Sequence, residues 1–317
     1  MSDKSGISIL GIYVADTAYV AKRMPSMGET LSGSGFSLGP GGKGSNQAVA
    51  AGRAGAQTSF ISKIGNDPFG EMALKIYQES GVTPKLTIMD DMPSGAAFIF
   101  VDEQTGANAI IVYPGAAGTI SVEDVEAQRA CIESSSVFVT QLEQPPEAAH
   151  KGLEIARNAK VRTVFNPAPA NDFPDAIYPL CDYIVPNETE AEALVGFPIL
   201  TEQDAARAGD MLLARGVGAA LITLGERGVY YHTSQVSRLI PSVTNGVVID
   251  TAGAGDAFIG GFAAALADGA NDIEAVQFGC ATAGIAVTRR GTAPAMPDLK
   301  EILELLETPD AIKGGAR

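Results

Sequence analysis

Hydrophobic positions form two kinds of segment along the chain. Some are short apolar runs, and others are longer segments in which hydrophobic residues recur with helical periodicity. The short runs are typical of buried strands and occupy residues 8–14, 58–64, 137–140, 162–165, 183–185 and 219–223. The periodic segments predict helices at residues 43–55, 69–78, 122–132, 147–159, 188–195 and 205–215. From about residue 120 the two kinds of segment alternate regularly, which predicts right-handed βαβ units. We therefore expect an α/β fold with a doubly wound, mostly parallel sheet flanked by helices.

Two regions depart from this alternation. Residues 12–40 and 93–113 hold extended hydrophobic segments that Gly and Pro interrupt. We expect them to form a small antiparallel β-sheet lid inserted into a single domain that spans residues 1–317. The last part of the chain returns to the main pattern, with a strand predicted at residues 246–249 and helices at 257–290 and 298–306.

Composition and charge narrow the class of function. The 317 residues are 46% hydrophobic, and the formal net charge of −15 would repel the phosphates of nucleic acids and anionic lipids. Three widely spaced cysteines and two histidines support neither a disulfide framework nor a zinc site. The longest apolar runs are too short to span a membrane. The sequence therefore predicts a cytoplasmic protein that acts on small molecules, with neither nucleic acid nor membrane as a partner.

The most informative motif is Asp-Thr-Ala-Gly-Ala-Gly-Asp at residues 250–256, directly before an apolar helix-like segment. Its glycines permit a tight bend at the start of the helix, where unpaired N–H groups and the helix dipole bind anions. Asp256 lies in the first turn of that helix, so a carboxylate is held beside a site for negative charge. One interpretation is an ordinary helix start, because Asp is common there. The other is a phosphate-handling site with its own general base.

Polar clusters follow six of the predicted strands. They are Asp16, Glu143, Asn166, the segment 187–190, the segment 223–225 and Asp256. Ligands of a doubly wound sheet bind beyond the carboxyl ends of its strands. We therefore expect these clusters to meet at one edge of the sheet.

A second glycine-rich loop spans residues 39–47. It lacks the spacing of a P-loop, because a glycine and not Ser or Thr follows Lys43. The loop either lets backbone N–H groups approach a ligand, with Lys43 and Asn46 as further donors, or is an ordinary turn that caps a helix. Asp16 and Glu143 would accept hydrogen bonds from paired sugar hydroxyls, or would be solvated loop carboxylates.

Asn187 and Glu190 have a spacing that fits two roles. Three residues apart at the start of a predicted helix, they match a capping box. Mg²⁺ prefers carboxylates combined with waters and phosphate oxygens, so the same pair would suit a nucleotide-bound magnesium ion. The residue types alone leave both roles open.

Five of these segments together resemble the ribokinase-like family of carbohydrate kinases, over essentially the whole chain. They are Gly-Gly-Lys-Gly-Ser-Asn-Gln-Ala-Val-Ala-Ala-Gly-Arg at residues 41–53, Asn-Pro-Ala-Pro at 166–169, Asn-Glu-Thr-Glu-Ala-Glu at 187–192, Ile-Thr-Leu-Gly at 222–225 and the 250–256 motif. They occur in the order of the family, and the first favours its ribokinase branch over the fructokinase- and adenosine kinase-like branches. The resemblance implies ATP-dependent phosphorylation of the terminal hydroxyl of a pentose, with D-ribose, giving ribose 5-phosphate, as the first choice.

The resemblance also implies roles for individual residues. Asp256 would be the general base, and the backbone of Gly253, Ala254 and Gly255 would hold the transferred phosphate. The implied sugar contacts are Asp16, Gly42, Lys43, Asn46, Glu143 and Asp256. The implied contacts of ATP and its Mg²⁺ are Asn187, Glu190, Thr223, Gly225 and Gly255. A K⁺ ion beside the anion site is implied at Asp250, Ala252, Val287, Arg290 and Gly291.

Val14 departs from the family pattern, in which an Asn at this position would hydrogen-bond a sugar hydroxyl. Losing such a bond weakens binding by about 0.5–1.5 kcal/mol, so an apolar wall here would favour 2-deoxyribose or another pentose or ketose. Alternatively, Val14 only packs and Asp16 is sufficient to bind ribose.

The family and the apolar face of a strand-rich lid both predict a homodimer formed through the lid. Two alternatives to a sugar kinase stay open at this point. One is a sugar-binding sensor without catalysis, and the other is a nucleoside kinase, which the low aromatic content of 6% disfavours.

Overall fold

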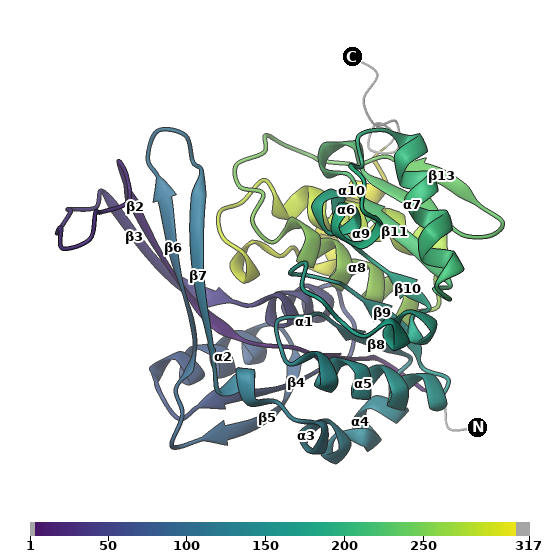
Figure 1. The fold of residues 1–317 in the computed structure, drawn as a ribbon, viewed down its shortest axis with the longest axis horizontal. Coiled ribbons are helices and arrows are strands. Elements are labelled where there is room, and N and C mark those ends of the chain that lie inside the picture. The colour runs from purple at the N-terminus through teal and green to yellow at the C-terminus, as the bar shows by residue number, and fades with distance from the viewer. Residues whose placement is uncertain (1–3, 309–317) are drawn as a thin grey trace.

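The computed structural model describes residues 4–308, which form a large sheet covered by helices and a smaller sheet at one side (Figure 1). The large sheet has nine strands in the order β13-β12-β11-β10-β9-β8-β1-β4-β5. The strands from β11 to β5 are parallel, and β12 and β13 extend one edge in antiparallel pairs. Their bounds are β1 (Ile7–Leu10), β4 (Thr58–Gly65), β5 (Val82–Met89), β8 (Val137–Thr140), β9 (Arg162–Phe165), β10 (Tyr183–Ile184), β11 (Ala219–Thr223), β12 (Val229–His232) and β13 (Ser237–Ile240). The predicted α/β fold with a mostly parallel sheet is confirmed.

Helices cover both faces of this sheet. One face packs against α1 (Lys43–Arg53), α2 (Pro68–Glu79), α8 (Ala254–Ala267), α9 (Asp272–Ala286) and α10 (Leu299–Leu306). The other face packs against α3 (Val122–Ala127), α4 (Arg129–Ser134), α5 (Pro146–Asn158), α6 (Glu188–Val195) and α7 (Glu202–Ala214). Strand side chains alternate between the two cores, so Val137 and Val139 of β8 enter the first core and Phe138 enters the second. No helix within residues 4–308 combines the length and apolar character needed to cross a membrane.

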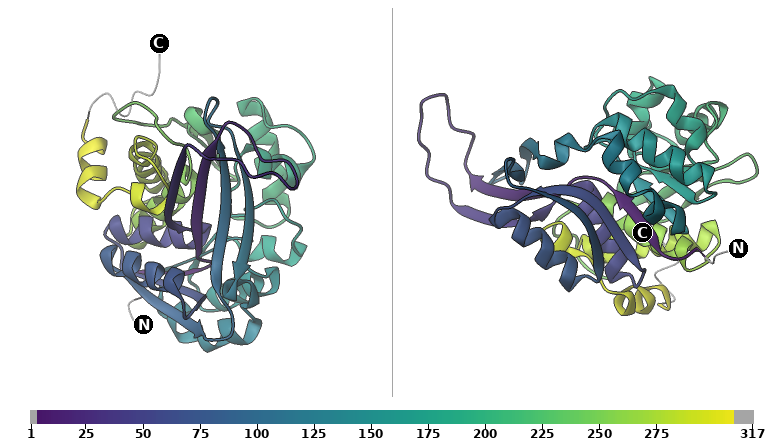
Figure 2. Two further views of the ribbon diagram at one scale, coloured as in Figure 1. Left: turned by 90° about the vertical axis from the view of Figure 1, so that its left-hand side faces the viewer. Right: turned by 90° about the horizontal axis from the view of Figure 1, so that it is seen from below.

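The smaller sheet stands beside the helix-covered body (Figures 1 and 2). We call it the small sheet; it contains β3 (Gly35–Gly41), β2 (Val14–Ala21), β6 (Ser94–Asp102) and β7 (Asn108–Gly115), in that order. The β2–β3 and β6–β7 pairs are antiparallel, but β2 and β6 run parallel. The expectation of a purely antiparallel sheet is therefore wrong. The parallel pair arises because each hairpin contributes one central strand, and both central strands leave the body in the same direction.

The strand predicted at residues 8–14 is divided between the two sheets. β1 ends at Leu10 and β2 begins at Val14, so the chain leaves the large sheet within three residues. Gly11 lies at this exit, where a Cβ atom would approach within 2.4 Å of Gln141 Oε1 and 2.8 Å of Gly44 Cα. The exit therefore depends on the absence of a side chain at position 11.

The strand predicted at residues 246–249 is wrong. This segment is an exposed loop in which Val247 is 82% exposed. No strand of the described chain pairs with it, and the N–H groups of Ile249 and Asp250 instead donate to the carbonyl of Val287. The predicted helix at 122–132 is also divided, because α3 ends before Gln128 and α4 begins after it.

The remaining helical elements are short 3₁₀ turns. They are η1 (Ala116–Thr119), η2 (Asp175–Leu180), η3 (Gly225–Arg227) and η4 (Ala293–Ala295). η4 matters for the site, because it follows Thr292, whose hydroxyl donates to the carbonyl of Pro40 on β3 at 3.0 Å. This contact joins the end of the chain to the small sheet.

Candidate active site

Four of the six polar clusters predicted from the sequence contribute to the wall of a cavity of about 150 Å³ at the carboxyl-terminal edge of the large sheet, and Asp16 and Glu143 lie next to it. The cavity is lined by Lys43, Asn166, Ala168, Val185, Asn187, Glu190, Thr223, Thr251, Gly253, Ala254, Gly255, Asp256 and Ile259. These residues come from the start of α1, the chain just beyond β9 and β10, the end of β11 and the first turns of α6 and α8. The expected convergence is therefore found, whereas the roles of the residues stay predictions.

Asp256 lies in the first turn of α8 with 7% of its surface exposed. Its Oδ2 accepts a hydrogen bond from Asn46 Nδ2 at 3.0 Å, and its Oδ1 accepts one from Gln47 Nε2 at 3.0 Å. Burial raises the pKa of Asp256, whereas the charge of Lys43 and the two amide hydrogen bonds act in the opposite direction. The carboxylate is thus held in place with lone pairs to spare, as a general base requires.

The start of α8 forms an anion cradle directly beside Asp256. Gly253 caps the helix with a φ of 74°, in the left-handed region that favours glycine. In the described part of the chain, no backbone carbonyl accepts from the N–H groups of Gly255 or Asp256, as expected for the first turn of a helix. A Cβ atom on Gly255 would have no neighbour within 4 Å, so the cavity is open at this point. The turn can therefore receive a phosphate oxygen.

The predicted sugar-binding residues do not all line this cavity. Lys43 and Asp256 line it, and the others lie next to it, at Asp16, Gly42, Asn46 and Glu143. The backbone N–H of Lys43 donates to Glu143 Oε2 at 2.8 Å, which joins α1 to the chain after β8. Asp16 of β2 is approached by the hydroxyl of Thr292 at 3.5 Å. The small sheet thus brings Asp16 to the body, close enough to Asp256 for the two carboxylates to affect each other.

Several carboxylates share this region with one ammonium group. Burial raises the pKa of Glu143 to about 7 and that of Asp16 to about 6. Burial lowers the pKa of Lys43, but the charges of Asp256, Glu143 and Glu190 outweigh it, so the net shift is upward. Lys43 therefore stays charged, and the excess of carboxylates leaves the site able to accept a cation.

Asn187 and Glu190 form the capping box of α6. The N–H of Glu190 donates to Asn187 Oδ1 at 2.8 Å, and the N–H of Asn187 donates to Glu190 Oε2 at 2.9 Å. Both residues nevertheless line the cavity, and burial raises the pKa of Glu190. Residues 4–308 contain no cluster of three or more His, Cys, Asp or Glu side chains fit to hold a metal on their own. The carboxylates that line the cavity, Glu190 and Asp256, are ligand types that Mg²⁺ accepts together with waters and phosphate oxygens.

Thr223 ends β11 and Gly225 begins η3, directly beside this cap. Thr223 forms a parallel bridge with Asn187 and lines the cavity. Gly225 has a φ of 56°, and a Cβ atom there would have no neighbour within 4 Å. Open space above Gly225 is compatible with the position predicted for a nucleotide.

The loop predicted to hold K⁺ is brought together around Asp250. Its Oδ1 accepts from the N–H of Ala252 at 2.9 Å, and its Oδ2 accepts from the N–H of Gly291 at 3.0 Å. The carbonyl of Val287 accepts two N–H groups, so neither of its lone pairs is free for a cation. Among the residues described, no donor pairs with the carbonyls of Ala252 or Arg290. The five predicted positions are thus adjacent, but Val287 does not fit the role of ligand in this arrangement.

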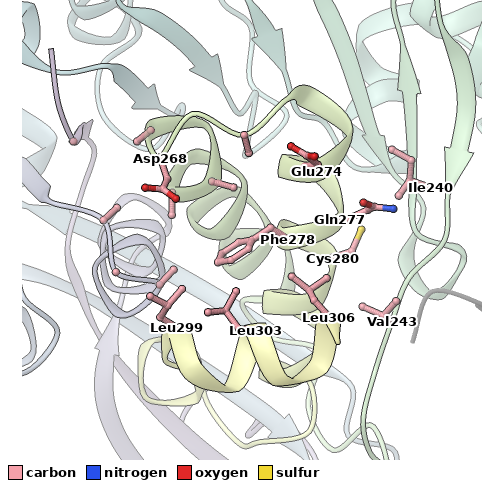
Figure 3. Close-up of a pocket in the computed structure, with 18 of the residues that line it drawn as sticks. Ile240, Val243, Asp268, Glu274, Gln277, Phe278, Cys280, Leu299, Leu303 and Leu306 are labelled. Carbon is pink, nitrogen blue, oxygen red and sulfur yellow. The ribbon is translucent and has the colours of Figure 1, made fainter. Parts of the chain in front are cut away.

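A larger cavity of about 680 Å³ lies elsewhere in the molecule, between α8, α9 and α10 (Figure 3). Its wall is mainly apolar, with Phe278, Leu299 and Leu303 pointing into it. The charged residues that line it are Asp268 and Glu274, both acidic. Without a basic group or an open helix start, this cavity does not suit a phosphorylated ligand.

Four cavity-lining residues, Ala168, Val185, Thr251 and Ile259, were not predicted as site residues, and neither were four side chains that form hydrogen bonds in or beside the site. These four side chains are Gln47, Gln141, Asn166 and Thr292, of which Asn166 was placed in a polar cluster without a role. Gln47 was not predicted because Asn46 was already assigned to the site. Side chains of consecutive helical residues point about 100° apart, so the next residue was not expected to reach the same carboxylate. Thr292 is 276 positions from Asp16 along the chain, so only the fold brings them together.

The sequence and the fold are both similar to those of known carbohydrate kinases. The family model "pfkB family carbohydrate kinase" matches residues 5–299. A ribokinase of Haemophilus influenzae is 37% identical over 302 residues, covering 95% of this chain and 98% of its own. A deoxyribokinase of Salmonella typhi is 32% identical over 304 residues, covering 95% and 98%. The structure of Arabidopsis thaliana ribokinase complexed with ribose and ATP superposes with a TM-score of 0.88 at 27% identity, covering 96% of this chain and 99% of that one.

Proposed function

The chain belongs to the pfkB family of carbohydrate kinases and is a sugar kinase, and on this premise we propose that it phosphorylates the terminal hydroxyl of D-ribose with ATP. One observation carries the assignment of the reaction centre: the buried carboxylate of Asp256 lies in the same helix turn as the unpaired N–H groups of α8. A base and an anion cradle are thus a few ångströms apart, as phosphoryl transfer to a hydroxyl requires.

In the proposed reaction, the sugar hydroxyl attacks the γ-phosphorus while Asp256 accepts its proton. The bond between the γ-phosphorus and the bridging oxygen breaks, and ADP leaves with that electron pair. The N–H groups at Gly255 and Asp256 stabilise the charge on the equatorial phosphate oxygens. Lys43, which also lines the cavity, would add positive charge. Positioning and electrostatics therefore provide the catalysis.

We propose Asp16, Gly42, Lys43, Asn46 and Glu143 as the sugar contacts, and Asn187, Glu190, Thr223 and Gly225 as the contacts of ATP and Mg²⁺. The magnesium ion would neutralise charge between the β- and γ-phosphates. Two observations support a magnesium ion here. Several carboxylates surround the single ammonium group of Lys43, and the capping box with Asn187 leaves Glu190 at the cavity wall.

We propose the loop around Asp250 as a monovalent cation site, with the carbonyls of Ala252 and Arg290 as ligands. Their lack of donors in the described chain supports this assignment. Gly291 would orient the Asp250 carboxylate through its N–H, and Val287 would become a ligand only if the 249–250 backbone moved away. Activity measured in KCl, NaCl and choline chloride at constant ionic strength tests it, and equal rates in all three salts would exclude a K⁺ requirement.

We infer that the small sheet is the lid of a single-domain enzyme and that two copies associate through it. Its outer face carries exposed apolar side chains, among them Tyr19, Phe36 and Ile111, with exposed fractions of 43%, 60% and 66%. The register places these three residues on the face opposite Asp16. Exposed apolar area of this kind is stabilised by a partner surface.

2-Deoxyribose is the second candidate substrate, and Val14 supports it. Val14 is 3% exposed and lies two residues before Asp16, so both side chains are on the same face of β2. An apolar group beside Asp16 does not require a hydroxyl on the sugar. The similarity to a deoxyribokinase is compatible with this possibility.

Steady-state kinetics with ATP on ribose, 2-deoxyribose and several ketoses test the proposal. We expect the highest kcat/KM with ribose, and product analysis should show the phosphate on the terminal hydroxyl. Binding of sugar without ATP consumption would instead identify a sensor. A kinase that prefers a nucleoside would also overturn the proposal.

A further inference from the structure

Three buried side-chain amides, those of Gln47, Gln141 and Asn166, form a continuous hydrogen-bonded network that reaches Asp256. Gln47 Nε2 donates to Asp256 Oδ1 at 3.0 Å and lies 3.3 Å from Asn166 Oδ1. Gln141 Nε2 donates to Gln47 Oε1 at 2.5 Å, and Asn166 Nδ2 donates to the carbonyl of Val185 at 2.8 Å. Gln47 and Gln141 are fully buried, and Asn166 is 5% exposed.

The orientation of each amide in this network is determined by its neighbours. The bond from Asn166 Nδ2 to a backbone carbonyl leaves Asn166 Oδ1 facing Gln47, so Gln47 must present its NH₂ group there. The same NH₂ group faces Asp256, and Gln47 Oε1 is then turned toward Gln141. Rotating Gln47 by 180° would place its oxygen against the Asp256 carboxylate and its NH₂ against that of Gln141. One arrangement therefore satisfies all the contacts.

Gln141 reaches Gln47 only because two glycines leave room for its amide. A Cβ atom on Gly11 would lie 2.4 Å from Gln141 Oε1, and one on Gly44 would lie 2.8 Å from it. Gln141 Oε1 is buried without a hydrogen-bond partner in the described structure, which costs free energy. The favourable contact of this side chain is therefore its donated bond to Gln47.

On the basis of the proposed function, we infer that Gln47, oriented by Gln141 and Asn166, is the positioning residue that holds the Asp256 carboxylate toward the sugar hydroxyl. It contacts the base rather than the substrate. Asn46 occupies the other carboxylate oxygen, so the two amides together prevent rotation of the carboxylate. A hydrogen bond to the charged form of a carboxylate also favours ionisation. Gln47 thus keeps the base both aimed and deprotonated.

Other charges act on Asp256 and are shared by all the variants compared below. They are Lys43 of α1, Glu190 of α6, Glu143 after β8 and Asp16 of β2. Because these groups stay unchanged, a shift of the acid limb of the rate profile reports the amide contact. Comparison with wild-type enzyme removes their common contribution.

The experiment compares the pH dependence of kcat in wild type, Gln47→Leu, Gln47→Glu and Gln141→Met. Gln47→Leu removes the donor, and we expect a fall in kcat of about tenfold or more at neutral pH and an acid limb about one pH unit higher. Gln47→Glu keeps the volume and the acceptor for Gln141 but places an acceptor against Asp256, so the acid limb should rise further. Gln141→Met keeps the hydrogen bond from Gln47 to Asp256 but removes the bond from Gln141 that orients Gln47. It should therefore shift the acid limb in the same direction by a smaller amount. The KM for ATP should stay within about twofold in all three.

Gln144→Met is the matched control. Gln144 is a buried glutamine of the same segment. It donates to Thr140 Oγ1 at 2.8 Å and to the backbone carbonyl of Gln141 at 2.6 Å, and in the described structure it bonds to none of the side-chain amides of Gln47, Gln141 and Asn166. Its loss should lower the melting temperature without moving the acid limb. The inference is overturned if Gln47→Leu and Gln47→Glu keep the wild-type pH profile, or if Gln144→Met moves it equally.

A readout independent of turnover separates this inference from the proposed function. The Asp256 carboxyl can be titrated by ¹³C NMR in labelled protein, with Asp256→Asn to assign its resonance. We expect its pKa to rise in Gln47→Leu and Gln47→Glu. If wild type phosphorylates no sugar but this rise is seen, the proposed function fails and the role of Gln47 stands. An unchanged titration overturns the role of Gln47 whatever the substrate is.

Discussion

Asn46 Nδ2 donates a hydrogen bond across 3.0 Å to Oδ2 of Asp256, which is 210 residues away along the chain. The bond joins the first turn of α1 to the first turn of α8, two helices packed together on one face of the large sheet. Asn46 Oδ1 is buried and has no partner in the described structure. The same amide can therefore fix the base with its NH₂ group and accept from a ligand hydroxyl with its oxygen.

Replacing Asp256 by Asn tests the assignment of the base. The change keeps the size of the side chain. Its new Oδ1 can accept from Gln47, and Asn46, whose Oδ1 has no other partner in the described structure, can rotate to accept from the new NH₂ group, so the fold should persist. Without a proton acceptor, kcat should fall by about 10²- to 10⁴-fold. Circular dichroism and calorimetric ATP titration provide the controls for fold and nucleotide binding. A variant that folds, binds ATP and retains more than about a tenth of wild-type kcat contradicts this role.

Alanine substitutions at Gly253 and Gly255 form a matched pair of variants that tests the anion cradle. Gly253→Ala forces a residue with a φ of 74° and a Cβ 3.3 Å from Thr292 Cα, so it should cost about 1–2 kcal/mol of unfolding free energy. Gly255→Ala has open space around its Cβ and a favourable helical position, so it should stabilise the protein by roughly 0.5–1 kcal/mol. Its methyl group nevertheless enters the space proposed for the phosphate. We expect a higher melting temperature together with a reduced kcat or a raised KM for ATP.

The two measurements on Gly255→Ala move in opposite directions only if the cradle has a function. A variant that is both more stable and fully active would show that no phosphate approaches the N–H group at position 255. Thermal unfolding and steady-state kinetics on the same preparation decide between these results.

Parts of the fold with a strong local pattern were predictable from the sequence. The apolar runs of β8 and β9 and the periodicity of α5 gave bounds within one residue of those observed. β5 was missed, because Pro84 and its largely exposed side chains remove the pattern of a buried strand. The strand at 246–249 was predicted wrongly, because an apolar run does not by itself supply a neighbouring strand. Pairing partners are a property of the whole fold.

The site was predictable where a residue carries its own chemistry. Asp256 and the glycine turn stand out because a carboxylate beside a helix start has a clear function. Gln47 and Gln141 are neutral amides, and their role exists only through their contact with Asp256 and with each other. Such long-range contacts require the folded chain, so local patterns could not have indicated them.

Glu143 should make the stability of the protein depend on pH. Burial raises its pKa from an ordinary 4.5 to about 7 in the folded state, so the native protein binds more protons than the unfolded chain between these values. Stability should therefore fall as the pH rises from about 4.5 through 7. Glu143→Gln keeps an acceptor for the Lys43 N–H and removes this ionisation. From pH 5 to pH 8, the variant should gain roughly 1–3 kcal/mol in unfolding free energy relative to wild type.

Denaturant unfolding of wild type and Glu143→Gln at both pH values measures this difference. The raised pKa of Asp16, about 6, acts in the same direction in both proteins, so the difference between them reports the Glu143 carboxylate and its interaction with Asp16. An equal dependence on pH in the two proteins would mean that Glu143 is not held in a pKa-raising environment.

The outer face of the small sheet should determine the oligomeric state. Ile111→Glu places a charge at a position that is 66% exposed on this face, where a partner copy would have to desolvate it. We expect wild type to sediment as a dimer and the variant as a monomer with unchanged secondary structure. Leu200→Glu, which changes a side chain that is 73% exposed in the loop between α6 and α7, is the matched control. If wild type is monomeric, or if both variants stay dimeric, the small sheet is not the interface.

Val14 should determine how strongly the enzyme distinguishes ribose from 2-deoxyribose. Val14→Asn places an amide on the face of β2 that carries Asp16, between Gly41 and Gly95 of the neighbouring strands. Without sugar the buried amide lacks a partner, so the unfolding free energy should fall by about 1–3 kcal/mol. With ribose bound, the amide gains a hydroxyl partner that 2-deoxyribose lacks. The ratio of kcat/KM for ribose to that for 2-deoxyribose should therefore rise by about fivefold or more.

Val14→Ala separates this hydrogen-bond effect from a change of space. It removes the same apolar wall without adding a polar group, so both sugars should lose kcat/KM by similar factors and their ratio should stay near that of wild type. If this ratio of kcat/KM values rises equally in Val14→Asn and Val14→Ala, the change in sugar preference comes from the loss of the valine side chain and not from a new hydrogen bond. A ratio that is unchanged in Val14→Asn would place Val14 out of reach of the sugar, and the preference would then depend on Asp16 and its neighbours across the small sheet.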